Sequence, residues 1–305
     1  MENNTVQRKS SYLEDPENNI DLSSDDKFQF FLIRHGQTNF NVEYDKYKDN
    51  PERPEFLQLR TRVEFIDPPL NLTGLNQALK QRKIINQLNF LIVFVSPMIR
   101  ACQTAIEMFA EHPNKNKIHF VLAPIIKEGL NCSNDLSHSI EYLYSLFGAH
   151  NKEKNYGIEF DFSFTYGGLF GEPRLWNAMM LTDLDAVKLL YKSVSHKSVS
   201  HAEINDQILK YMADSKYRRL EAHSMIFDRV QIFKEFVKRY VELHRKLDIH
   251  EKYAIVSHAS FLRALSSSGV DQETGWLLDY QDFKNCEVKP WLNFQISQDQ
   301  SINLV

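Results

Sequence analysis

Ionisable side chains follow four short apolar runs of the chain, at the point where each run ends. They are, in chain order, Arg34 and His35, then Arg100, Glu128 and His258. Runs of this length are typical of buried parallel strands, and in open α/β sheets ligand sites form at the carboxyl ends of the strands. We therefore predict that these five side chains meet at one site.

These residue types suit the chemistry of a phosphate monoester. Transfer of a phosphoryl group needs cationic donors on its oxygens, a nucleophile in line with the leaving group, and an acid that protonates the leaving oxygen. Arg34 and Arg100 are permanent cations, and a partly protonated His258 would add to their charge, so this set needs no metal and no cofactor. Taken singly, each residue is more often structural or solvated. Taken together, the set indicates phosphoryl transfer.

Alternating strands and helices would position these residues. We expect strands at 28–33, 90–95, 118–123 and 253–257, with amphipathic helices at 72–88 and 223–247. Asn71 is a natural cap for the first helix, whereas Ser96 and Pro97 are expected to open a further helix that carries Arg100 in its first turn. Unpaired N–H groups in a first turn favour an anion. The pattern predicts an α/β fold, a three-layer α/β/α sandwich around a mostly parallel sheet.

The chain of 305 residues is read as a polar, disordered tail at 1–26 and one domain at 27–305. A long insertion at about 130–201 is rich in aromatic residues, and we expect it to form a lid. It ends in the repeat Lys192-Ser193-Val194-Ser195-His196 followed by Lys197-Ser198-Val199-Ser200-His201, which we interpret as a duplicated loop and not a metal site. An edge strand is expected near 294–297.

Composition excludes several classes of function. A net charge of −4 provides no field for nucleic acid or for an anionic membrane. Cys102, Cys132 and Cys286 share no metal or disulfide spacing, and we expect reduced thiols. The polar start resembles no signal peptide, and the longest apolar run is too short to span a bilayer. We expect a cytoplasmic protein whose partner is a small phosphorylated substrate, with no nucleic-acid or membrane partner; the sequence does not indicate an oligomeric state.

The motifs in this order resemble those of the histidine phosphatase superfamily, the phosphoglycerate-mutase-like proteins. They are Leu32-Ile33-Arg34-His35-Gly36 with Asn41, Pro69-Leu70-Asn71 with Gly74 and Gln77, Ser96-Pro97-Met98-Ile99-Arg100 with Gln103-Thr104-Ala105, Glu128, and Val256-Ser257-His258. The stretch 132–143, with 160–163 and 175–176, is most similar to the plant and fungal members. The chain departs from the usual motif residues of the family at Asn71, Lys127 and Ala259, and these departures leave the identity of the substrate undetermined.

The resemblance implies roles for the site residues. His35 would accept the phosphoryl group as phosphohistidine, Arg34, Arg100 and His258 would surround it, and Asn41 would contact it. Glu128 would be the proton donor and later the base, although Asp135 or Glu141 could serve instead. The function implied is a phosphatase. A phosphomutase and a non-catalytic phosphate-binding protein stay open as alternatives.

Overall fold

The computed structural model describes residues 28–50, 52–166, 176–177, 180–181, 188, 192, 199–214, 220–244, 251–292 and 294–296. The predicted tail at 1–26, and the predicted repeat apart from Lys192 and residues 199–201, lie outside the described residues. Within the described part of the chain, no helix combines the length and apolarity needed to cross a bilayer. All three cysteines are buried and none forms a disulfide, as expected for reduced thiols.

A six-stranded sheet forms the centre of the fold, in the order β4-β3-β2-β5-β1-β8. Its strands are β1 Phe30–Arg34, β2 Phe90–Val95, β3 His119–Leu122, β4 Phe160–Asp161, β5 Lys252–Ser257 and β8 Val288–Pro290. All neighbours pair in parallel except β8, which runs antiparallel to β1. The register pairs Arg34 with Ser257 and Val95 with Val256. The strands therefore end along one edge of the sheet, where the predicted site residues follow them.

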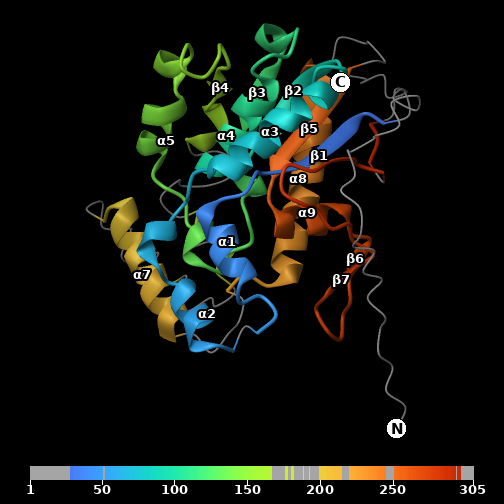
Figure 1. Ribbon diagram of the computed structural model, residues 1–305. Helices are drawn as coiled ribbons and strands as arrows, with labels where there is room; N and C mark the ends of the chain where they lie inside the picture. The colour runs from blue at the N-terminus through green and yellow to red at the C-terminus, as the bar shows by residue number, and fades with distance from the viewer. Residues whose placement is uncertain are drawn as a thin grey trace.

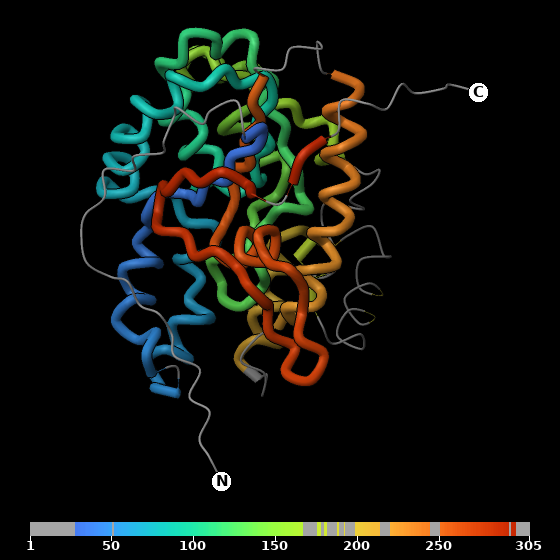
Figure 2. Tube along the Cα trace, turned by 90° about the vertical axis from the view of Figure 1, so that its right-hand side faces the viewer, coloured from blue at the N-terminus to red at the C-terminus, as the bar shows by residue number. Residues whose placement is uncertain are grey.

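Helices cover both faces of this sheet. On one face pack α3 Leu72–Ile85, α4 Ile99–Phe109 and α5 Ile140–Phe147; on the other pack α8 His223–His244 and α9 Ala259–Ser266. Alternation along β1 explains the two cores, because Phe31 and Ile33 face the first group whereas Phe30 and Leu32 face the second. The turned view in Figure 2 places α3 and α8 on opposite sides of the strands. The three-layer α/β/α arrangement predicted from the sequence is confirmed (Figure 1).

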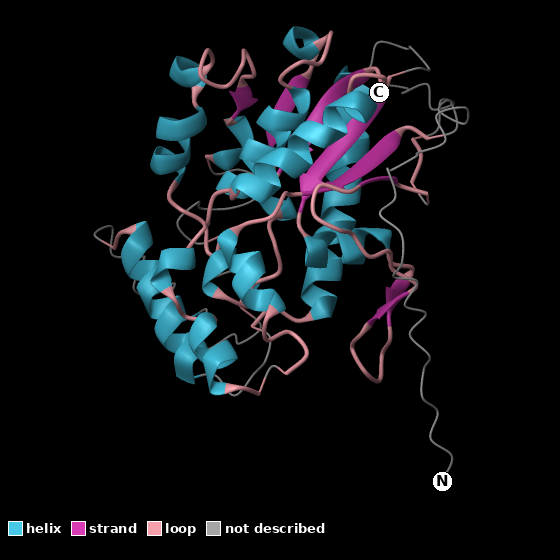
Figure 3. Ribbon diagram, in the orientation of Figure 1, coloured by secondary structure: helices cyan, strands magenta, loops and turns pink. Residues whose placement is uncertain are grey.

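Further helices lie beyond the carboxyl ends of the strands. They are α1 Asn39–Asp45, α2 Pro54–Leu59 and α7 His201–Asp214 (Figures 1 and 3). The small hairpin of β6 Gly269–Val270 and β7 Leu277–Leu278 lies at the same end of the molecule. Short 3₁₀ turns complete the described elements, at Val63–Phe65, Lys115–Lys117, Pro124–Ile126, Ser133–Asp135, Ala149–Asn151 and Ser163–Thr165.

Several aromatic side chains of the predicted insertion lie in the core beside the sheet. Its strand β4 joins the edge of the sheet beside β3, and Phe147, Phe160 and Phe162 are buried in the core under α4. Phe164 packs with its ring centroid 5.1 Å from that of Phe236 in α8. These aromatic side chains therefore extend the sheet and its core, because a short edge strand needs apolar cover on its faces.

Two predictions are wrong. The edge strand is β8 at Val288–Pro290, whereas residues 294–296 form no strand and Phe294 stacks on Trp291 with centroids 4.1 Å apart. His201 does not lie in a loop: it begins α7, and its Nε2 lies 2.7 Å from the carbonyl oxygen of Ser137. A burial-driven fall in the pKa of His201 agrees with this enclosed position.

Candidate active site

His35 lies directly after β1 and is almost completely buried, with 3% of its surface exposed. Its Nδ1 lies 2.7 Å from the carbonyl oxygen of Gly36, and its Nε2 lies 3.3 Å from Nε of Arg100. A carbonyl only accepts and a guanidinium only donates, so Nδ1 carries the proton and Nε2 carries the lone pair. Burial, followed by the charges of Arg100 and Arg34, lowers the pKa of His35 well below its usual value. The ring is therefore neutral, with one nitrogen available as a nucleophile.

Polar side chains from α3 and α4 hold the loop that follows His35. The N–H of Gly36 donates to Oγ1 of Thr104 at 3.0 Å, and the N–H of Gln37 donates to Oε1 of Gln77 at 2.9 Å. Gly74 lets α3 approach the loop, since a Cβ at this position would lie 2.2 Å from the carbonyl oxygen of Gln37. These motif residues therefore fix the backbone that follows His35.

Arg100 is almost completely enclosed, with 1% of its surface exposed in the first turn of α4. Its Nη1 donates to the carbonyl oxygen of Asn134 at 2.8 Å and lies 3.7 Å from Oδ1 of Asp67, while its Nη2 lies 3.8 Å from Oδ1 of Asp135. Nη2 has no hydrogen-bond partner among the described residues. Because a buried donor without a partner is costly, this nitrogen is suited to an anionic ligand.

Asp67 links Arg100 to the start of α4. Its Oδ1 accepts the N–H of Ile99 at 2.9 Å, and this backbone N–H belongs to the first turn that the sequence marked as an anion site. Burial raises the pKa of Asp67 to about 6, against the opposing effect of Arg100. The sequence analysis did not find Asp67, because an Asp before two prolines is also typical of a simple turn.

Arg34 supplies a second partly buried cation beside His35. Its Nη1 donates to the carbonyl oxygen of Phe283 at 2.7 Å, which leaves Nε buried without a partner among the described residues. Two further hydrogen bonds anchor the backbone of Arg34 and His35. The Nδ2 group of Asn285 donates to the carbonyl oxygen of His35 at 3.0 Å, and the N–H of Cys286 donates to the carbonyl oxygen of Arg34 at 3.0 Å. Sequence reasoning missed this segment, since it carries no catalytic residue type in a recognisable pattern.

His258 is fully buried at the N-terminal end of α9, with its ring centroid 5.0 Å from that of His35. Its Nε2 lies 2.8 Å from Oγ of Ser96, and its Nδ1 has no partner among the described residues. Burial, then the charge of Arg100, lowers the pKa of His258 well below its usual value, so the expected partial protonation is wrong for this environment. Ser96 was predicted to cap α4; the cap residue is Met98, and Ser96 instead contacts His258.

Glu128 and Asp135 are two further carboxyl groups that act on these cations. Oε1 of Glu128 accepts the N–H groups of Gly129 at 2.8 Å and of Ser260 at 3.0 Å, which ties Glu128 to the first turn of α9. Oδ2 of Asp135 accepts the N–H groups of Asn131 and Cys132, at 2.9 and 2.8 Å. Burial and then the charge of Glu128 raise the pKa of Asp135 to about 7. Burial therefore favours the protonated form of Asp135.

The remaining candidates lie further from this centre. Asn41 is the third residue of α1, where its Oδ1 accepts the N–H of Thr38 at 2.9 Å. In the described structure its hydrogen bonds run to Thr38 and not to His35 or Arg100, which leaves its Nδ2 group for a ligand. Glu141 is exposed in the first turn of α5. The structure thus brings His35, Arg34, Arg100, His258 and Glu128 together as predicted and adds Asp67, Ser96 and Asp135 around them.

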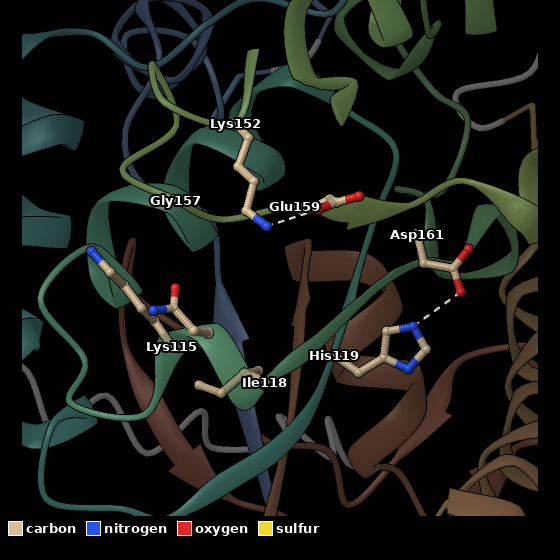
Figure 4. Close-up of a pocket in the computed structure, with 8 residues that line it drawn as sticks. Lys115, Ile118, His119, Lys152, Gly157, Glu159 and Asp161 are labelled. Atoms are coloured by element: carbon tan, nitrogen blue, oxygen red, sulfur yellow. Dashed lines mark hydrogen bonds and ion pairs between the residues drawn. The ribbon is translucent and has the colours of Figure 1, made fainter. Parts of the chain in front are cut away.

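A separate pocket lies at the opposite end of the sheet, where β3 begins (Figure 4). Its volume is about 240 Å³, and it is lined by residues that include Lys152, Glu159, His119 and Asp161. Lys152 pairs with Glu159 at 2.9 Å, and Nε2 of His119 lies 3.1 Å from Asp161. Because its charged groups neutralise each other and it is smaller than usual ligand pockets, it does not compete with the strand-end site.

Comparison with known proteins agrees with the motifs. Residues 30–121, which contain His35, Arg34 and Arg100, match the model of the histidine phosphatase superfamily (branch 1). A stretch of 101 residues is 31% identical to fructose-2,6-bisphosphatase TIGAR B of Danio rerio and covers 33% of this chain and 34% of the fish protein. The similarity to the histidine phosphatase superfamily (branch 1) therefore lies in residues 30–121, and the fish protein is matched over only 34% of its own length. The fish match does not support the expected special similarity to plant and fungal members.

Solved structures of phosphatases resemble the chain only loosely. A mycobacterial glucosyl-3-phosphoglycerate phosphatase in complex with VO3 superposes with a TM-score of 0.40 and 13% identity, covering 86% of this chain and 89% of that one. The ecdysone phosphate phosphatase of Bombix mori in complex with tungstate gives a TM-score of 0.43 and 11% identity, covering 86% and 87%. Likenesses at this level do not define an activity.

Proposed function

We propose that the chain is a phosphatase that hydrolyses phosphate monoesters through a phosphohistidine on Nε2 of His35. The observation that carries this proposal is the hydrogen bond from Nδ1 of His35 to the carbonyl of Gly36, 2.7 Å long. It leaves the lone pair on Nε2, and the low pKa of the buried ring keeps that nitrogen unprotonated at neutral pH. The match to a family of histidine phosphatases supports the same reading.

In the first step, Nε2 of His35 attacks phosphorus, the N–P bond forms, and the bond from phosphorus to the ester oxygen breaks. Arg34, Arg100 and His258 would donate to the three remaining phosphoryl oxygens, since each has a buried nitrogen without a partner among the described residues. A carboxylic acid gives its proton to the departing oxygen. In the second step the same carboxylate takes a proton from water, whose oxygen attacks phosphorus and releases inorganic phosphate and free His35.

Two carboxyl groups are candidates for this acid. Glu128, the expected donor, is anchored to the first turn of α9, which His258 precedes. Asp135 has the raised pKa, about 7, and lies 3.8 Å from Nη2 of Arg100. We propose Glu128 as the group that transfers the proton and Asp135 as the second candidate. Asn41 is proposed to contact the phosphoryl group through its Nδ2, the end of its amide that α1 leaves unused.

Detection of the intermediate tests the proposal. The protein is mixed with a radiolabelled phosphate monoester and quenched in alkali within one turnover, and the label on the protein is then tested for its stability in acid. We expect an acid-labile label on the wild type, none on His35→Ala, and release of inorganic phosphate without an added acceptor, which separates a phosphatase from a mutase.

His112→Ala is the matched control. His112 is also a buried histidine held by a backbone carbonyl, with its Nε2 2.9 Å from the carbonyl oxygen of Leu88. This variant should keep the label even where its stability is lower. A His35→Ala protein with full activity would show that another residue is the nucleophile.

A further inference from the structure

Ser96 and His258 form an isolated hydrogen-bonded pair at the centre of the site. Both residues are fully buried, and Oγ of Ser96 lies 2.8 Å from Nε2 of His258. The backbone fixes their positions, because the N–H of Ser96 donates to the carbonyl oxygen of Val256 at 3.0 Å and so ties the end of β2 to the end of β5. The pairing of these strands therefore places the hydroxyl against the ring.

The pair can hold its proton in two ways. If the Ser96 hydroxyl donates to Nε2, the proton of His258 is on Nδ1. If Nε2–H donates to the hydroxyl instead, the hydroxyl hydrogen is left without an acceptor among the hydrogen bonds of the described residues, since Oγ of Ser96 has His258 as its partner there. A buried hydroxyl whose hydrogen has no acceptor is destabilising. The first arrangement is therefore preferred.

Nδ1 of His258 is the ring nitrogen that faces no partner in the described structure. The charged and titratable groups that act on this ring are Arg100, His35, Lys127 and Arg34, and all of them disfavour a second proton. A phosphoryl oxygen only accepts hydrogen bonds, so an Nδ1 that carries a proton attracts it and an Nδ1 that carries a lone pair repels it.

We propose that Ser96 is a positioning residue that holds His258 in the Nδ1–H tautomer, so that His258 contributes a neutral hydrogen-bond donor to the phosphoryl group. This inference rests on the proposed phosphoryl site. It assigns the family motif around Ser96 a role beyond the start of α4, because the same short segment supplies both Arg100 and the group that orients His258.

The tautomer can be measured directly in protein labelled with ¹⁵N at histidine. Long-range ¹⁵N–¹H correlation spectra distinguish a protonated Nδ1 from a protonated Nε2, and the spectrum of His258→Gln assigns the signal among the 11 histidines. We expect the Nδ1–H form in the wild type and a mixture of tautomers in Ser96→Ala. Inorganic phosphate, used as the ligand, should bind Ser96→Ala about 3- to 10-fold more weakly, the range for loss of one oriented hydrogen bond.

Ser266→Ala is the matched control, since Ser266 is a buried serine of α9 whose hydroxyl donates to the carbonyl oxygen of Leu262 at 2.9 Å. It should leave the tautomer of His258 and the phosphate affinity unchanged, and Ser96→Thr, which keeps the hydroxyl, should retain the wild-type tautomer. An Nε2–H tautomer in the wild type, or a Ser96→Ala protein with the wild-type tautomer and phosphate affinity, would overturn the inference. The tautomer and the phosphate affinity are measured without turnover. A failure of this inference can therefore be distinguished from a failure of the proposed phosphatase activity.

Discussion

Replacement of Asp135 by Asn should make the folded protein less sensitive to alkaline pH. The pKa of this buried carboxyl rises from 3.8 to about 7, chiefly through burial and then through the charge of Glu128. A carboxyl whose folded pKa is raised contributes stability that is fully present below about pH 4 and is lost as pH rises through about 7. Asn keeps an oxygen that can accept the N–H groups of Asn131 and Cys132, so the change removes the charge and preserves the contacts.

The size of the effect follows from the shift. About 3 pKa units correspond to about 4 kcal/mol of unfolding free energy, at about 1.36 kcal/mol per unit. Between pH 5 and 9 the stability falls only up to the folded pKa of about 7, so about 2 of the 3 pKa units contribute to the loss in this interval. In that interval the stability of Asp135→Asn relative to the wild type should therefore increase by about 3 kcal/mol.

Urea unfolding at a series of pH values measures this difference. The control is Glu141→Gln, which neutralises an exposed carboxyl in α5 and should stay within about 0.5 kcal/mol of the wild type at every pH. If the difference between Asp135→Asn and the wild type changes by less than about 1 kcal/mol from pH 5 to 9, Asp135 is ionised throughout. The assignment of a proton to Asp135 at neutral pH would then be wrong.

Four further outcomes are expected. Glu128→Gln should slow hydrolysis of alkyl phosphates by about 100-fold or more and spare nitrophenyl phosphate in the phosphorylation step, because nitrophenolate leaves without a proton; equal slowing of both would indicate a structural role. Activity should survive chelators and be inhibited by vanadate, since arginine side chains supply the positive charge; loss in chelator and recovery with a divalent ion would contradict this. Phe164→Ala should lower stability by about 2 kcal/mol, whereas Tyr166→Ala, at a side chain that is 55% exposed, should stay within about 0.5 kcal/mol; thermal unfolding compares them. His201→Ala should destabilise by about 1 kcal/mol through loss of the contact with Ser137, and an unchanged melting temperature would refute that role.

The strands and the main site residues could be predicted because local pattern and position agree there. The apolar run before His35 is a strand whose successive side chains alternate between the two cores, one on each face of the sheet. The parallel register of β1, β2 and β5 brings the ends of these strands together. Asn71 caps α3 as expected, with Gly74 as the donor at 2.8 Å. At these positions the local sequence pattern is compatible with only one kind of structural element.

The residues that were missed depend on contacts between distant parts of the chain. Ser96 before Pro97 fits a helix cap, and only the pairing of β2 with β5 shows that its hydroxyl meets His258. Phe160 and Phe162 were expected in a lid but lie in the core. Aromatic residues in a long connection show no helical or strand periodicity, so the sequence does not distinguish core residues from residues that cover a site. His201 looked like part of a loop repeat, yet its partner, Ser137, lies 64 positions earlier.

The contacts of Asn285 and Cys286 with the end of β1 also bear on how the protein folds during synthesis. Asn285 lies 250 positions after His35, and its side chain donates a hydrogen bond to the carbonyl oxygen of His35. A ribosome synthesises the strand that carries His35 early and the residues that brace it about 250 positions later, as the separation of this pair requires. The nascent chain therefore carries an unbraced His35 through most of translation, and the backbone around His35 reaches its final geometry only when this late segment has folded against β1.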